Sequence, residues 1–234
     1  MPPADTPPIA IHAPAKVAVD AYAALASQYV YRGVALRDRP TTSFAVSTHT
    51  GGWFVDLWNG LVDDARYEYG PYHHTTSNDS EWDVDVSAGY GAALGDDWQW
   101  SLAGARIVNI GGRHSNDYTE WRGNLFYRDA LRAQLAYSDD YLQRGWSSWN
   151  AEVSGSRALT DSLRGEWGMG HSHGAGRSNA DYQYGWLGLS GFWLRTHWDA
   201  RWVDAGSGAR YVADSNAGGS RVVVSLSWAL QLLP

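Results

Sequence analysis

The segment Gly170-His-Ser-His-Gly174 has the G-x-S-x-G spacing that positions a nucleophilic serine in α/β-hydrolases. That chemistry needs the serine on a sharp strand-to-helix turn, where its hydroxyl is exposed beside a base. The following residues, 175–181, show no helical periodicity, so the required context is missing. The sequence therefore predicts no catalytic residue, and Ser172 with His171 or His173 remains only as the candidate nucleophile of a lipid-hydrolysing barrel.

Two histidine pairs have a side-chain type that binds Zn, Cu or Ni: His73 with His74, and His171 with His173. No carboxylate stands at clear ligand spacing, and adjacent histidines chelate one ion poorly. We therefore predict polar loop histidines, and neither a metal nor a cofactor. The absence of Cys excludes disulfides, a thiolate metal site and a cysteine nucleophile.

His197 alternates with Arg195, Asp199 and Arg201 along one extended segment, so the four side chains are expected on one face. Such a patch inside a barrel could bind an anion or respond to pH. An equally good reading is a wall of ion pairs that fills a narrow lumen. Both readings need a strand that points these residues inward.

The elements that would position these residues are strands, because the apolar side chains repeat every two residues. In 120–127, for example, Trp121, Gly123, Leu125 and Tyr127 alternate with Glu120, Arg122, Asn124 and Phe126. The same alternation predicts twelve strands along the chain. They are expected near 16–32, 42–49, 53–58, 82–90, 97–108, 120–127, 131–138, 147–157, 163–171, 182–190, 194–202 and 222–230.

The connections alternate between short and long. The short ones are expected at His49–Gly52, Gly95–Asp97, Asp129–Ala130, Thr160–Asp161 and Ser190–Gly191, and the long polar ones near 33–41, 63–80, 109–117, 139–146, 172–181 and 204–219. Outer-membrane barrels combine tight periplasmic turns with long external loops, whereas a soluble sandwich has no reason to do so. The pattern predicts a twelve-stranded antiparallel transmembrane β-barrel with both termini on the turn side.

One face of nearly every predicted strand is apolar or small, as lipid contact requires, and the other face carries charge. The charged face combines arginines and carboxylates in similar number, which suits a lumen crossed by ion pairs. The predicted pore-lining residues are Arg32, Asp83, Asp85, Glu120, Arg122, Arg132, Glu152, Arg164, Glu166, Arg195, His197, Asp199 and Arg201.

The composition agrees with a barrel that crosses a membrane by strands. The apolar residues include 14 Trp and 14 Tyr but only 4 Phe, and no long apolar stretch could form a transmembrane helix. The net charge of -7 argues against nucleic acid as a partner. We expect residues 1–15, which are rich in Pro, to be a flexible segment before a single barrel domain at 16–234. This sequence shows no signal peptide, and we expect the exported precursor to carry one.

Several short motifs resemble those of the TorF-type porin family of bacterial outer membranes. They are Ser27-Gln-Tyr-Val-Tyr-Arg-Gly33, Asp117-Tyr-Thr-Glu120, Ala136-Tyr-Ser-Asp-Asp-Tyr141 and Arg221-Val-Val-Val-Ser-Leu-Ser227. The resemblance covers residues 16–230 and implies a single barrel with a passive-diffusion role. The chain departs from the usual aromatic end of such proteins, because it closes with Leu232-Leu233-Pro234; we expect Trp228 and Leu230 to supply the assembly signal.

The sequence thus predicts a porin-like channel in the bacterial outer membrane, through which small polar or charged solutes diffuse. Strand-borne charges would set its selectivity, and the connections 63–80 and 204–219 would narrow its mouth. Its partners would be the lipid bilayer and small solutes, with the oligomeric state open. Two alternatives remain: a barrel enzyme that cleaves lipid or protein, and a closed barrel that binds a partner at the cell surface.

Overall fold

The computed structural model describes residues 17–65, 76–111, 116–143, 145–175, 181–211 and 218–233. Within these ranges the chain is almost entirely β-strand, with two short 3-10 helices, η1 (Tyr141–Gln143) and η2 (Ser207–Tyr211). The strands are β1 (Ala18–Ala26), β2 (Tyr29–Tyr31), β3 (Val34–Arg37), β4 (Thr41–Thr50), β5 (Trp53–Ala65), β6 (Thr76–Leu94), β7 (Trp98–Ile110), β8 (Tyr118–Tyr127), β9 (Leu131–Ser138), β10 (Ser148–Ala158), β11 (Leu163–Gly174), β12 (Tyr182–Trp193), β13 (Thr196–Ala205) and β14 (Arg221–Leu233). No helix in these described ranges is long and apolar enough to cross a membrane.

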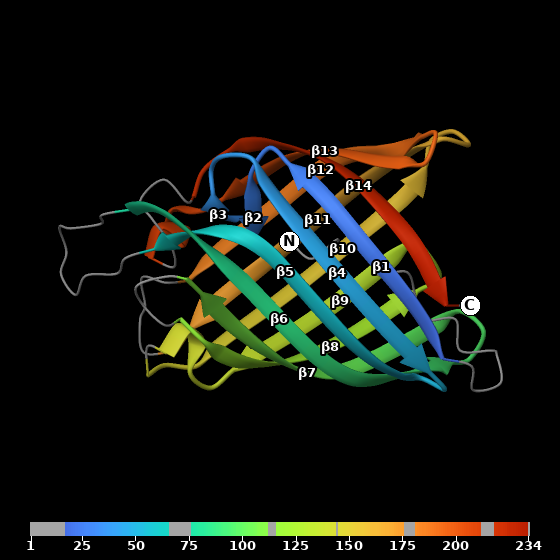
Figure 1. The fold of residues 1–234 in the computed structure, drawn as a ribbon, viewed down its shortest axis with the longest axis horizontal. Coiled ribbons are helices and arrows are strands. Elements are labelled where there is room, and N and C mark those ends of the chain that lie inside the picture. Colours follow the sequence, from blue (N-terminus) through green and yellow to red (C-terminus); the bar gives the residue numbers. More distant parts are fainter. Residues whose placement is uncertain are drawn as a thin grey trace.

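Twelve of these strands form one closed barrel (Figure 1). Each pairs antiparallel with its neighbour in the order β4 to β14, and β1 closes the ring by pairing with both β4 and β14. The strands run obliquely around the barrel axis, as closure of a sheet requires (Figure 1). The predicted twelve-stranded antiparallel barrel is confirmed.

The two faces of the wall differ as the alternation predicts. On β8, Trp121 is 57% exposed and Leu125 is 37% exposed, whereas Glu120, which faces the lumen, is 1% exposed. Neighbouring strands follow the same rule, with large apolar side chains on the outside and polar side chains facing the lumen. An outer apolar face without a protein partner suits contact with lipid.

The short connections lie together at one end of the barrel, with the carboxyl terminus (Figure 1). One predicted turn is wrong. Ser190 and Gly191 lie inside β12, and the turn is Leu194-Arg195, where Leu194 has a φ of 58°. Ser-Gly looks like a turn in sequence, but here Ser190 is fully buried and donates a hydrogen bond to Glu166 Oε1.

The strand predicted at 16–32 is in fact two elements. The barrel strand β1 ends at Ala26, and β2 pairs with β3 in a separate two-stranded sheet. Residues 27–40 therefore connect two adjacent barrel strands, β1 and β4, and the expected open loop at 33–41 is corrected to a folded hairpin. This hairpin, β2–β3, packs inside the barrel towards the end that carries the long connections, against β5, β7, β8 and β12.

The turn of the hairpin is Arg32-Gly33, and both residues have positive φ, 50° and 77°. Two such residues fit the tight type I′ turn that joins twisted antiparallel strands. Gly33 is also required by packing, because a Cβ there would lie 2.5 Å from the Tyr184 Cβ. Val34, the next residue, is 1% exposed. The hairpin is thus held by close apolar packing as well as by its turn.

Candidate functional site in the barrel lumen

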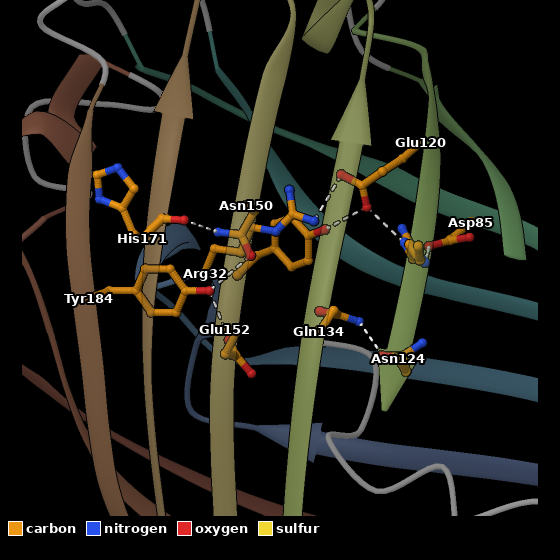
Figure 2. A network of polar contacts seen from close by, with 11 residues as sticks. Arg32, Asp85, Glu120, Asn124, Gln134, Asn150, Glu152, His171 and Tyr184 are labelled. Carbon is orange, nitrogen blue, oxygen red and sulfur yellow. Dashed lines mark hydrogen bonds and ion pairs between the residues drawn. The ribbon is translucent and has the colours of Figure 1, made fainter. Parts of the chain in front are cut away.

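A chain of ion pairs joins the hairpin to the barrel wall (Figure 2). Arg32 Nη2 lies 2.9 Å from Glu120 Oε2, and Arg122 Nε donates to Glu120 Oε1 at 2.8 Å. Arg122 Nη1 then reaches Asp85 Oδ2 on β6 at 2.6 Å. Tyr31 on β2 adds a long hydrogen bond to Glu120, at 3.5 Å. Two guanidiniums and two carboxylates alternate, so the network is neutral as a whole. All four side chains are largely buried, with Arg122 the most exposed at 16%.

A second network lies on the β11–β13 wall. Arg201 Nη2 donates to Glu166 Oε2 at 2.8 Å, and its Nε donates to Asp199 Oδ2 at 2.7 Å. The Arg201 guanidinium also sits over the Trp186 ring, 4.4 Å from the centroid. The planar guanidinium can make these contacts at once, which a lysine ammonium cannot.

Tyr184 links the hairpin turn to β10. Its hydroxyl donates to Glu152 Oε2 at 2.8 Å and contacts Asn150 Oδ1 at 3.2 Å (Figure 2). Its Cβ is the nearest atom to the position that a Cβ on Gly33 would take. Tyr184 therefore has two roles: its hydroxyl forms hydrogen bonds with β10, and its side chain packs against the hairpin turn.

Nearer the short turns, the polar residues contact each other but remain partly exposed. Asn124 Oδ1 accepts a hydrogen bond from Gln134 Nε2 at 3.0 Å (Figure 2). It also accepts one from Arg132 Nη2 at 2.9 Å. Arg164 Nη2 donates to Ser156 Oγ at 2.6 Å. These side chains are half-buried, so this part of the lumen is open to solvent.

The structure places the predicted pore-lining residues in three groups. Arg32 is on the hairpin rather than on a barrel strand, and Arg195 lies in the exposed turn before β13, away from the lumen. The others lie on the inner face of the wall: Asp83, Asp85, Glu120, Arg122, Arg132, Glu152, Arg164, Glu166, His197, Asp199 and Arg201. His197 lies near Ser227, with 3.4 Å between Nδ1 and Oγ.

Two cavities flank the hairpin. The one that we name the acidic cavity, of about 70 Å³, lies between the Tyr29 and Tyr31 side of the hairpin and β5–β8. Its carboxylates are Asp63, Glu81, Asp83 and Asp85, and its aromatic rings are Tyr29, Tyr31, Trp58, Tyr118 and Tyr141. The second, of about 120 Å³, lies between Val30, Arg32 and Gly33 and the β12–β14 wall, and it contains Asp199 and Arg201.

Sequence reasoning missed the acidic residues at the ends of the strands. Asp63 was placed in a loop, but it lies on β5 and accepts from Arg37 Nη1 at 2.7 Å and from Arg39 Nη2 at 2.8 Å. Glu81 falls just outside the strand predicted at 82–90 and is 3% exposed on the inner face of β6. The spacing of two residues between Glu81, Asp83 and Asp85, which places all three on one strand face, was the signal that could have found it.

The candidate nucleophile, Ser172, does not lie beside either of its candidate bases, His171 and His173. Ser172 is buried on the inner face of β11, and the alternation of a strand places His171 and His173 on the opposite face. His173 Nδ1 instead lies 2.8 Å from Asp181 Oδ2. His73 and His74 lie outside the described residues. No group of three metal-ligating side chains occurs in the part of the chain that the structure describes.

Asp181 precedes β12 and lies beyond the strands that form the barrel. Partial burial acts to raise the pKa of its carboxyl, but the hydrogen bonds from His173 and from the Gly174 amide outweigh burial and lower that pKa. The Gly174 N–H donates to Asp181 Oδ1 at 3.0 Å. This contact fastens the end of β11 to the start of β12.

No family model and no characterised protein sequence matches the chain. Among solved structures, the KdgM porin is similar over 90% of this chain and 98% of its own, with a TM-score of 0.50 and 11% identity. The NanC porin is similar over 92% of this chain and 100% of its own, with a TM-score of 0.51 and 10% identity. A chain solved in work on the in-meso crystallization of membrane proteins covers 92% of this chain, with a TM-score of 0.55 and 8% identity.

At these identities the likeness concerns the fold. The closed twelve-stranded antiparallel barrel is a fold that this chain shares with the outer-membrane porins KdgM and NanC. The structure adds a feature that the strand pattern did not predict, a hairpin from the first long connection packed inside the lumen.

Proposed function

We propose that this protein is a bacterial outer-membrane channel through which small polar or charged solutes diffuse passively, and that the hairpin β2–β3 forms its constriction. The observation that carries the proposal is the position of the hairpin: it lies within a closed barrel with a charged wall, and cavities of about 70 and 120 Å³ remain beside it. The resemblance to TorF-type porins belongs to the same proposal, as does export by a signal peptide.

The wall charges differ in solvation between the two ends of the barrel, which supports a constriction at the hairpin. Arg132, Arg164 and Asn124 are half-buried near the short turns, where water reaches them. At the hairpin, by contrast, Glu120 is enclosed between Arg32 and Arg122. The field at the narrowest ring sets ion preference in a channel, so the charges beside the hairpin are the ones expected to select.

The geometry does not favour the enzyme alternative. A serine nucleophile needs a base within hydrogen-bonding reach, and the strand places Ser172 on the face opposite to His171 and His173. We therefore propose a channel without catalytic activity.

We further propose that the short turns face the periplasm and the long connections face outside, as in other outer-membrane barrels. Protease treatment of intact cells should then cut within 66–75 and leave the turn at Gly95–Asp97 whole. Cleavage at the short turns alone would show that the barrel has the opposite orientation.

A conductance experiment tests the constriction. Residues 28–39 are replaced by a short Asn-Gly link between β1 and β4, and single channels are recorded in planar bilayers. Because the link removes the hairpin but keeps all twelve barrel strands, we expect a small conductance for the wild type and a several-fold larger one for the variant. The matched control replaces the exposed turn Leu194-Arg195 by Asn-Gly and should conduct as the wild type does.

Two results would overturn the proposal. If both the wild type and the hairpin variant insert but never conduct, the barrel is not a channel. If the wild type conducts and removal of the hairpin changes nothing, the constriction lies elsewhere. Insertion is checked by the shift in gel mobility between heated and unheated samples.

A further inference from the structure

The charged side chains that line the acidic cavity are mostly carboxylates. Its lining holds four carboxylates and one guanidinium, that of Arg122. Asp63 forms ion pairs with Arg37 and Arg39, and Asp85 Oδ2 forms one with Arg122. Asp83 has no ion-pair partner among the described residues.

The buried oxygen atoms that lack a hydrogen-bond donor in this cavity include one from Asp83 and one from Asp85. Asp83 Oδ1 and Asp85 Oδ1 are both buried, and neither has a partner within the described part of the chain. Asp85 as a whole is only 8% exposed. Leaving a carboxylate oxygen buried without a donor is costly, so these two atoms call for a ligand that supplies N–H or O–H groups.

The aromatic residues of the cavity add a second feature that favours a cation. Tyr29 and Trp58 stack with 5.4 Å between ring centroids, and Tyr118 meets Tyr141 edge-on at 4.9 Å. The faces of such rings carry negative electrostatic potential and attract ammonium groups within about 6 Å. Rings beside a carboxylate also offer apolar surface for a short alkyl chain.

The spacing of the carboxylates disfavours a bare metal ion. Asp83 and Asp85 are two residues apart on one strand face, which separates their Cα atoms by about 7 Å. No three carboxylate or imidazole groups among the described residues come close enough to hold a metal. A ligand with several N–H donors can bridge oxygens that do not converge on one point.

We propose that the acidic cavity binds the protonated amino group of a small primary amine, with the ammonium between Asp83 and Asp85 and its alkyl part against Tyr29 and Trp58. The site lies beside the hairpin and goes beyond the proposed channel function. Binding is measured on the folded barrel in detergent, so the result does not depend on whether the barrel conducts.

Saturation-transfer NMR tests the site with three probes of similar size. Ethylammonium offers charge and N–H donors, tetramethylammonium offers charge alone, and ethanol is neutral. We expect ethylammonium to bind with a dissociation constant on the order of a few millimolar, the strength that so small a ligand can reach. Tetramethylammonium should bind more weakly, and ethanol should give no saturable signal.

The variant Asp83→Asn removes the charge at the same size and should raise the dissociation constant of ethylammonium about tenfold or more. Asp129→Asn, in an exposed short turn, removes an equal charge elsewhere and should leave binding unchanged. Gel mobility shows whether each variant is folded. If Asp83→Asn fails to fold, Asp83→Glu keeps the charge and should retain binding.

Three outcomes overturn the proposal. They are unchanged binding in Asp83→Asn, saturable binding of ethanol as strong as that of ethylammonium, and tetramethylammonium binding at least as tightly as ethylammonium. The comparison of the three probes uses the wild-type protein, so it decides the question whatever the variants do.

Discussion

The two halves of the lumen have similar polar walls but very different interiors. In the half that contains the hairpin, Glu120, Asn150 and Ser138 are almost completely buried. In the half near the short turns, Asn124 and Arg132 also face inward but are half-buried and reach water. The difference comes from the hairpin and not from the wall, because both halves are built from the same strands. A charged lumen face therefore does not by itself mean an open pore.

The same arginine chemistry has different consequences in the two halves. Arg122 in the hairpin half pairs with two carboxylates, whereas Arg132 in the turn half donates to the neutral amide of Asn124 and is half-buried. Desolvated ion pairs are costly to break, because the remaining charge stays buried, while exposed polar contacts contribute little. Four predictions follow from this contrast.

The largest effect is expected for Glu120→Gln in the hairpin half. It leaves Arg32 without a counter-charge in a dry environment, so the free energy of unfolding should fall by about 3–5 kcal/mol. Asn124→Ala, four residues along the same strand in the turn half, should cost about 1 kcal/mol or less. Refolding titrations in lipid vesicles measure both. Equal losses would show that the two halves are equally solvated.

Gly33→Ala should loosen the hairpin itself. The new Cβ would meet the Tyr184 side chain at 2.5 Å, and the φ of 77° disfavours any residue with a Cβ. Gly95→Ala is the matched control, because Gly95 has a φ of 75° and no atom within 4 Å of the added Cβ. Gly33→Ala should cost about 1–3 kcal/mol more than its control, through overpacking.

The same pair of variants separates hairpin packing from backbone strain in bilayer recordings. Conductance should rise in Gly33→Ala only. A rise in both variants would mean that general loss of stability, rather than release of the hairpin, opens the lumen.

Arg132→Gln should change selectivity with little effect on stability. The residue lies in the solvated half, so the free energy of unfolding should move by less than about 0.5 kcal/mol. Loss of one lumen cation should shift the reversal potential by a few millivolts towards cation preference, measured under a salt gradient. Arg201→Gln removes the guanidinium that forms ion pairs with the buried carboxylates of Glu166 and Asp199, so it should lower the free energy of unfolding clearly. Similar stability of the two variants would contradict the comparison.

The smallest effect is expected outside the lumen, at Asp181. Because its pKa in the folded protein lies below the ordinary value, its contact with Gly174 stabilises above about pH 4 and is lost as pH falls through the lowered pKa. The Gly174 amide shift in NMR should follow this titration, and Asp181→Asn should abolish it. Hairpin-half amides whose shifts follow the same titration would show that the two regions are coupled.

Much of the wall could be predicted from the chain alone, and the errors are local. The alternation along 120–127 and 131–138 correctly placed every side chain of those segments on its face. Ser190-Gly191 misled because its residue types favour a turn, while pairing with β11 keeps both residues in a strand. Glu81 was missed because β6 begins at Thr76, six residues before the predicted start at 82.

The hairpin could not be predicted from its own pattern. Tyr29 and Tyr31 continue the period of two from β1, so the segment is indistinguishable from more barrel strand. The turn Arg32-Gly33 is a weak signal, since Asn-Gly or Asp-Gly is the usual pair at such a turn. The contacts that fix the position of the hairpin come from residues distant in sequence. Glu120 forms an ion pair with Arg32, and Tyr184 packs so closely against residue 33 that only glycine fits there.

The sequence by itself determined the number of barrel strands, the facing of the clearly alternating ones, and a wall of arginines and carboxylates, because a strand encodes its two faces in adjacent residues. Only the tertiary structure decided which of those charges meet. Arg32, Glu120, Arg122 and Asp85 come from three distant segments, and barrel closure together with the folded-in hairpin sets the distances between them. The same reason explains why Asp83 Oδ1 has no hydrogen-bond partner within the described part of the chain: whether a charge finds a partner depends on what occupies the space in front of it.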